Sequence, residues 1–219
     1  GALVAASVAW AAPALAPVVP LAAAALGVPR RLPGPHVTLT FDDGPHPRGT
    51  PAVLECLDAA GVRALFFLVG EQVQRHPGLA REIADRGHVV AVHGYRHRLA
   101  LRIAPRALRA DLDRAHDVIG QATGTTPDLY RPPYGVFSLA TVAEVRRRGW
   151  RPLLWSHWGR DWARRATPRS VAALVLDGLG PGDVVLLHDA DDYSVPGSWR
   201  ATVGALDLLL PELARRGLI

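Results

Sequence analysis

From residue 36 onward, short apolar runs alternate with amphipathic stretches. The apolar runs predict strands over residues 37–41, 64–69, 88–92, 128–131, 150–156 and 183–187. Strands that are apolar on both faces and separated by helices are typical of a parallel sheet. The pattern therefore predicts an α/β fold, either an open doubly wound sheet or a barrel with fewer than eight strands.

The stretches between the strands have helical periodicity and recognisable ends. Thr50-Pro51 and Thr167-Pro168 each place an N-cap residue before a first-turn proline, and Gly61 and Gly149 are typical of helix ends. Helices are predicted from residue 50 to residue 61 and over residues 72–85, 105–119, 139–148, 167–177 and 198–216.

The first 29 residues contain no charged side chain. Their length suits a membrane span of about 20 residues, although Pro13, Pro17 and Pro20 would kink or divide a helix there. We expect membrane association through residues 1–29, with an apolar arm packed on the domain or on a neighbour as the alternative. The chain is accordingly divided into an apolar N-terminal segment, residues 1–35, and one domain, residues 36–219.

Composition excludes several classes of protein and partner. The chain has 219 residues, of which 49% are hydrophobic and 21% charged, as in globular proteins. Its net charge of +5 comes entirely from arginines that are scattered along the helices, and no nucleic-acid-binding signature is present, so no nucleic-acid partner is expected. The single Cys56 excludes an intrachain disulfide. No glycine-rich phosphate-binding motif follows the first strand.

Polar side chains follow five of the predicted strands. Asp42 and Asp43 end the first strand, where Gly44-Pro45 lets the chain leave the sheet. By itself this pair could belong to an ordinary solvated loop. The other strand ends contribute residues 93–97, 131–135, 161–162 and 188–189. Because the carboxyl ends of parallel strands form the functional edge of such folds, we expect these residues to meet there.

Several of these residues suggest particular chemistry. His93 and His97 are four apart, so on a helical turn both imidazoles would reach one ion, and a carboxylate would complete a common shell for Zn²⁺ or a similar metal. Arg131 is held extended by the prolines after it and could orient an acid. His188 ends a very apolar run, where partial burial could tune its pKa for a general acid.

Taken in order, these motifs resemble those of the polysaccharide deacetylase (NodB homology) family, carbohydrate esterase family 4. The matching segments are T-F-D-D-G-P at residues 40–45, His93 with His97, R-x-P-Y at residues 131–134, Asp161-Trp162, and L-x-H at residues 186–188. The resemblance covers residues 36–219 and implies a distorted (β/α) barrel of about seven parallel strands. Two positions depart from the family pattern: Gly94 replaces a hydroxyl residue, and Trp158 replaces an aspartate.

The resemblance also implies roles. Asp43, His93 and His97 would bind a divalent metal, with Zn²⁺ expected and Co²⁺ or Ni²⁺ as alternatives. The remaining implied roles are Asp42 as general base, Arg131 as its support, His188 as general acid, Asp161 as the group that tunes it, the Tyr134 backbone N–H as an oxyanion donor, and Trp162 and Leu186 as the acyl pocket.

The expected activity is hydrolysis of an N-acetyl or other N-acyl group on an amino sugar of an envelope polysaccharide or glycolipid. The expected location is the cell envelope, membrane-anchored or extracytoplasmic, with the orientation open. Two alternatives remain. The departures at Gly94 and Trp158 would suit a glycan-binding envelope protein without turnover. Similar metal chemistry would also serve deacylation of a non-sugar amide or ester.

Overall fold

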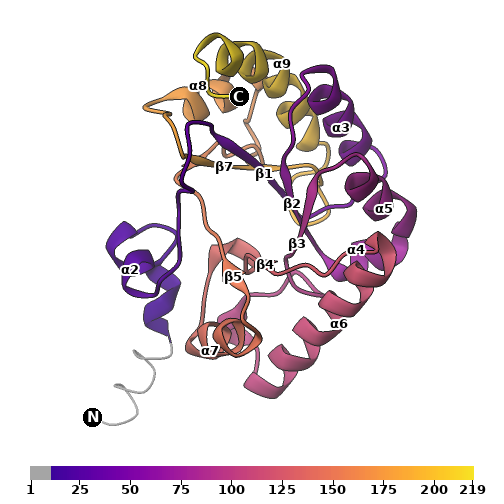
Figure 1. The fold of residues 1–219 in the computed structure, drawn as a ribbon, viewed down its shortest axis with the longest axis vertical. Helices are drawn as coiled ribbons and strands as arrows, with labels where there is room; N and C mark the ends of the chain where they lie inside the picture. The colour runs from indigo at the N-terminus through magenta and orange to yellow at the C-terminus, as the bar shows by residue number, and fades with distance from the viewer. Residues whose placement is uncertain (1–10) are drawn as a thin grey trace.

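Parallel strands form one curled sheet at the centre of the computed structural model, which describes residues 11–219 (Figure 1). The sheet has seven strands within this range, in the order β5-β4-β3-β2-β1-β7-β6, and every pairing is parallel. This confirms the predicted distorted (β/α) barrel. The strands are β1 (Thr38–Asp42), β2 (Leu65–Leu68), β3 (Val89–Val92), β4 (Leu129–Tyr130), β5 (Arg151–Pro152), β6 (His157–Trp158) and β7 (Val184–His188).

Helices cover the outside of this sheet (Figure 1). The main ones are α3 (Gly49–Ala59), α4 (Gly70–Arg75), α5 (Pro77–Asp85), α6 (Pro105–Thr123), α7 (Leu139–Arg148), α8 (Pro168–Leu176) and α9 (Trp199–Arg215). Thr167 caps α8 as predicted, through a capping box with Ser170. Thr50 does not cap α3: its hydroxyl bonds instead to the buried Asp189.

Two predicted elements differ from the structure, and one short strand was not predicted. The helix predicted over residues 72–85 is two helices, α4 and α5, because His76 has non-helical backbone angles and Pro77 starts a new helix. The strand predicted over residues 150–156 is shorter, since only β5 pairs within it. The two-residue strand β6 was not predicted, because a segment that short has no periodicity to detect.

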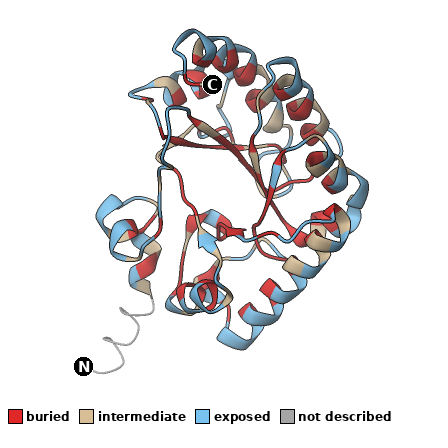
Figure 2. Cartoon of the chain, viewed as in Figure 1, coloured by how far each residue is buried: buried red, intermediate tan, exposed pale blue. Residues whose placement is uncertain are grey.

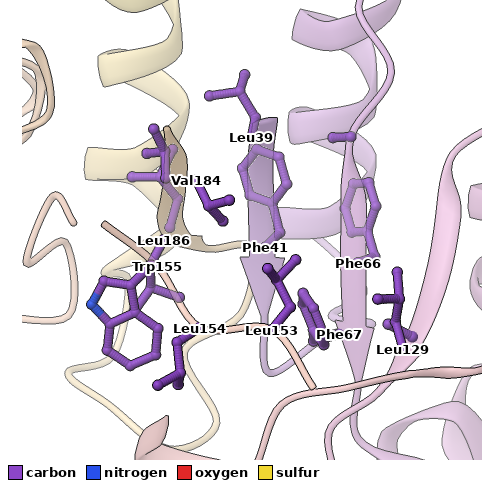
Figure 3. Close-up of a cluster of buried hydrophobic side chains, with 14 of the residues drawn as sticks. Leu39, Phe41, Phe66, Phe67, Leu129, Leu153, Leu154, Trp155, Val184 and Leu186 are labelled. Carbon is purple, nitrogen blue, oxygen red and sulfur yellow. The ribbon is translucent and has the colours of Figure 1, made fainter. Parts of the chain in front are cut away.

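The hydrophobic core lies between the sheet and its helices. The strands are largely buried, while the helices bury one face and expose the other (Figure 2). Phe41 on β1 and Phe66 on β2 are paired in register, and their rings stack with centroids 5.1 Å apart (Figure 3). The apolar strand residues predicted from the sequence therefore form the framework that holds the strand ends in place.

The described part of the N-terminal segment, residues 11–35, packs at the open side of the curled sheet, between the chain after β5 and the chain before β7 (Figure 1). Two short helices lie in these residues, η1 (Ala12–Leu15) and α2 (Pro20–Ala25), and Ala16, Ala23 and Val28 join the buried core. The Leu154 N–H donates to Pro29, and the Leu32 N–H donates to Gly182.

The expected membrane segment falls partly outside the described residues, which begin at residue 11. Within residues 11–219, no helix is both long enough and apolar enough to cross a membrane.

Candidate active site

Asp42 and His188 lie side by side at the ends of neighbouring strands. β1 and β7 are paired so that Asp42 is the register partner of His188, and residues in register on parallel strands project to the same face. Asp43 leaves the strand with φ of 80°, which turns the chain away at the predicted place. Gly44 follows, and a side chain at this position would collide with the Asp189 carboxylate.

Asp43, His93 and His97 converge on one point. One ligand atom from each lies within 4.8 Å of the others: Oδ1 of Asp43 is 3.4 Å from Nε2 of His93 and 3.1 Å from Nε2 of His97. His93 must carry its proton on Nδ1, because this atom lies 2.7 Å from the Arg131 carbonyl oxygen, which can only accept. Its Nε2 lone pair therefore faces the carboxylate.

This arrangement fits a divalent cation. Oδ1 of Asp43 is buried and has no hydrogen-bond partner within the described residues, as expected of an atom that faces other lone pairs. Burial by itself raises the pKa of Asp43, but contact with His93 and His97 and the charge of His188 lower it overall, so the group is a carboxylate. Two imidazoles and one carboxylate are a common ligand set for Zn²⁺.

The loop that carries the two histidines is braced from two helices. Asp111 of α6 accepts the Tyr95 N–H at 2.8 Å and the Arg98 guanidinium at 3.1 Å. The N–H groups of Gly70 and Glu71, at the start of α4, donate to the carbonyls of residues 94 and 95. Gly94 has φ of 91°, a conformation that disfavours the hydroxyl residue of the family pattern. The loop is thus held by its neighbours rather than by a side chain at position 94.

Arg131 lies behind Asp42 and is fully buried. Its Nη1 is 2.6 Å from Oδ1 of Asp42 and 2.8 Å from the Thr40 hydroxyl. The Nε and Nη2 groups donate to the carbonyls of Leu153 and Leu154, each at 3.0 Å. A guanidinium fixed by this many acceptors holds one oxygen of Asp42 in place. The other oxygen, Oδ2, points toward His93 at 3.8 Å.

His188 is held by Asp161 in a similar way. Nδ1 of His188 donates to Oδ1 of Asp161 at 2.9 Å, and the His188 N–H donates to Oδ2 at 2.6 Å. Thr202 of α9 donates to the same Oδ2 at 2.7 Å. Burial by itself lowers the pKa of His188, but Asp161, together with the charges of Asp43 and Asp42, raises it to about 10. The imidazole is therefore protonated near neutral pH, with Nδ1 committed to Asp161.

A cavity of about 560 Å³ joins these groups. Asp42, the three candidate ligands and His188 line it, as do the predicted pocket residues Tyr134, Trp162 and Leu186. Arg131 and Asp161 are not among the lining residues and support the site from behind. The cavity is also lined by residues for which the sequence predicted no role: Gly135, Trp155, Tyr193, Ser194 and Val195.

Some of these lining residues could have been predicted from the sequence more easily than others. Trp158, noted in the sequence only as a departure, lines the cavity because its register partner on β7 is Leu186. Its ring lies between those of Trp155 and Trp162, at centroid distances of 5.9 and 5.4 Å. Strand alternation could place Trp158 only if β6 were known, and Trp155 lies outside that strand. Tyr193 lies on an irregular loop that carries no periodic signal.

A second group of metal-ligand residue types, His46, Asp191 and Asp192, has a different character. Nδ1 of His46 accepts the N–H groups of Arg48 and Gly49, so in the neutral ring the proton sits on Nε2. Nε2 lies 3.2 Å from Oδ1 of Asp191 and can donate to it. Both ring nitrogens are therefore used in holding the loop, in keeping with a structural histidine.

Comparison with known proteins agrees with the motifs. The model of the polysaccharide deacetylase family matches residues 30–153. A chitooligosaccharide deacetylase of Bradyrhizobium sp. (strain ANU 289) is 38% identical over 191 residues, which cover 83% of this chain and 85% of the relative.

Solved structures share the fold. A peptidoglycan N-acetylglucosamine deacetylase in complex with 4-naphthalen-1-yl-N-oxidanyl-benzamide superposes with a TM-score of 0.78 at 29% identity, over 85% of this chain and 86% of the other. A carbohydrate esterase family 4 pseudoenzyme from Bacillus anthracis has a TM-score of 0.74 at 26% identity, over 83% of this chain and 61% of the other. With the family model matching more than half of its length, the chain belongs to the polysaccharide deacetylase family.

Proposed function

We propose that this protein is a metal-dependent hydrolase that removes the acetyl group from an N-acetylated amino sugar of a cell-envelope polysaccharide or glycolipid. The main support is the placement of Asp42 and His188 as register partners beside the convergent group of Asp43, His93 and His97, all lining one cavity. The names of the related chitooligosaccharide and peptidoglycan deacetylases support the substrate class.

In this proposal Asp43, His93 and His97 hold the metal, which we take to be Zn²⁺, with Co²⁺ or Ni²⁺ as alternatives. A divalent ion bound there would polarise the acyl carbonyl and lower the pKa of water. The surroundings of His93 suit this role, because its other ring proton is donated to the Arg131 carbonyl, which would orient the ring toward an ion.

Asp42 acts as the general base. Arg131 occupies Oδ1, which leaves Oδ2 on the cavity side to accept a proton from the attacking water. The oxygen of the water then bonds to the acyl carbon. The Tyr134 backbone N–H, at the rim of the cavity, is proposed to donate to the developing oxyanion.

His188 acts as the general acid. With Nδ1 committed to Asp161, the proton that it can transfer is on Nε2, and it passes to the leaving nitrogen as the C–N bond breaks. The products are acetate and a free amino sugar. Trp162 packs edge-on against His188 at 5.2 Å and, with Leu186, is proposed to enclose the acyl methyl group.

The direct test is an acetate-release screen on metal-loaded protein with chitooligosaccharides, peptidoglycan, acetylxylan and a lipid-linked N-acetyl sugar. We expect release from at least one N-acetylated sugar, with loss on chelation and recovery when metal is returned. Release only from acetylxylan would contradict the proposed N-acetyl amino sugar.

A family member without turnover is the second candidate, since the Bacillus anthracis neighbour is described as a pseudoenzyme. Saturable glycan binding with no metal in elemental analysis and no acetate from any substrate would establish this candidate instead.

A further inference from the structure

Tyr193 contacts one of the candidate metal ligands directly. Its ring stacks on His97, with centroids 4.3 Å apart and an interplanar angle of 14°. Tyr134 packs edge-on against the same imidazole at 4.6 Å. His97 therefore packs against the rings of Tyr193, Tyr134 and His93, of which only that of Tyr193 is nearly parallel to it.

The two candidate histidine ligands are supported differently. Nδ1 of His93 donates to the Arg131 carbonyl, the kind of hydrogen bond that usually orients a metal-binding imidazole. Nδ1 of His97 is buried and has no hydrogen-bond partner among residues 11–219. The orientation of His97 is therefore set by ring packing where that of His93 is set by a hydrogen bond.

Tyr193 is itself fixed to α4. Its hydroxyl donates to Oε1 of Glu71 at 2.7 Å and accepts from Nε2 of Gln72 at 3.1 Å. The same helix start binds the histidine loop, because the Glu71 N–H donates to the Tyr95 carbonyl at 2.8 Å. One turn of helix thus sets both the backbone that carries His97 and the ring that lies against it.

We propose that Tyr193 is a positioning residue for the metal site: its ring holds the His97 imidazole in the orientation that directs Nε2 at Asp43. A metal-bound imidazole also carries partial positive charge, which the face of a tyrosine ring attracts. The stack then takes the place of the missing hydrogen bond to Nδ1. This inference rests on the proposed metal site and adds a residue that neither the motifs nor strand alternation indicates.

The test is metal affinity, measured on purified protein by competition with a chromogenic chelator for Zn²⁺ and by the visible spectrum of the Co²⁺ form. Tyr193→Leu removes the ring, and we expect affinity to fall about 10- to 100-fold, as when a group that orients a metal ligand is lost. Tyr193→Phe keeps the ring and should recover most of the loss. The Co²⁺ spectrum should change in the leucine variant and not in the phenylalanine variant.

Two controls separate positioning from loop stability. Ser198→Ala removes the 2.9 Å contact between the Ser194 and Ser198 hydroxyls in the same loop, leaves the stack intact, and should bind metal normally. Thermal melting in chelator shows whether each variant folds without metal.

The outcomes distinguish this inference from the proposed function. Wild-type protein that binds no metal would contradict the proposed metal site itself. Wild-type binding with unchanged affinity in Tyr193→Leu would overturn only the role of Tyr193, as would equal losses in the leucine and phenylalanine variants.

Discussion

Asp42 and Asp43 are adjacent in the chain but have different surroundings. Asp42 is still on β1 and is paired with a fully buried arginine, whereas Asp43 has turned off the strand toward two imidazoles. The difference arises from one residue with positive φ at the strand end. Sequence reasoning could predict that the chain leaves the strand here, because of Gly44-Pro45, and the structure adds which partner each acid meets.

The surroundings of His188 predict how activity depends on pH. Its pKa is raised to about 10, chiefly by Asp161 acting against burial. As general acid it must be protonated, so activity should fall as pH rises through this pKa. Asp161→Asn removes the negative charge, lowers the pKa, and should move the basic limb of the kcat/KM profile down by ~1–3 pH units.

Thr202→Val is the matched control, because it removes one hydrogen bond to Asp161 and keeps the charge. It should move the basic limb much less. An Asp161→Asn enzyme with the wild-type basic limb would show that His188 is not the group that limits activity at high pH.

At the scale of elements, the site depends on the β1–β7 register and on the loop between β3 and α6. Most strands were predictable because they lie in continuous apolar runs, and most helices because their apolar periods are long. β6 and the break before α5 were not predicted, the first because two residues form no period, the second because the apolar period continues across Pro77. Tyr193 could not be placed, because its contact with His97 joins two loops that are distant in sequence.

Asp111 tests how far the histidine loop depends on α6. It accepts bonds from Tyr95 and Arg98, and nothing at position 94 can replace them. Asp111→Ala leaves the buried Tyr95 N–H without this partner, and we expect a loss of ~1–3 kcal/mol in the free energy of unfolding. Metal affinity should also fall.

Asp113→Ala, on the same helix, is the control: its carboxylate is largely exposed and bonds only to Arg148 within the described residues. Asp111→Ala protein that matches this control in both stability and metal affinity would contradict the bracing role.

In the molecule as a whole, residues 11–35 pack against the open side of the curled sheet. Burying the apolar surface of an uncharged stretch is favourable, but the sequence does not show which surface the stretch packs against. Within the described residues, Ala16, Ala23 and Val28 bury theirs in the core of the domain. The candidate metal site also joins distant parts of the chain, because Asp43 follows β1, the two histidines lie on the loop after β3, and a bound ion would link them.

Metal binding should therefore stabilise the fold. A ligand at 100 times its Kd that binds only the folded state adds about 2.7 kcal/mol, which for a chain of this size raises the Tm by roughly 5–10 °C. Differential scanning calorimetry with and without Zn²⁺ measures the shift. His97→Ala should show little or none, and an equal shift in that variant would place the ion elsewhere.

Asp43 is proposed to hold the metal while Asp42 accepts the proton, and measuring metal content together with activity separates these two roles. Metal content and acetate release from a chitooligosaccharide are compared in wild type, Asp42→Ala and Asp43→Ala. We predict that Asp42→Ala keeps its metal and loses about 10²–10⁴-fold in activity, as expected on removal of a general base. Asp43→Ala should lose both metal and activity. An Asp42→Ala protein that still releases acetate at the wild-type rate would contradict the role of Asp42 as base. An Asp43→Ala protein that retains tightly bound metal would contradict the role of Asp43 as a metal ligand.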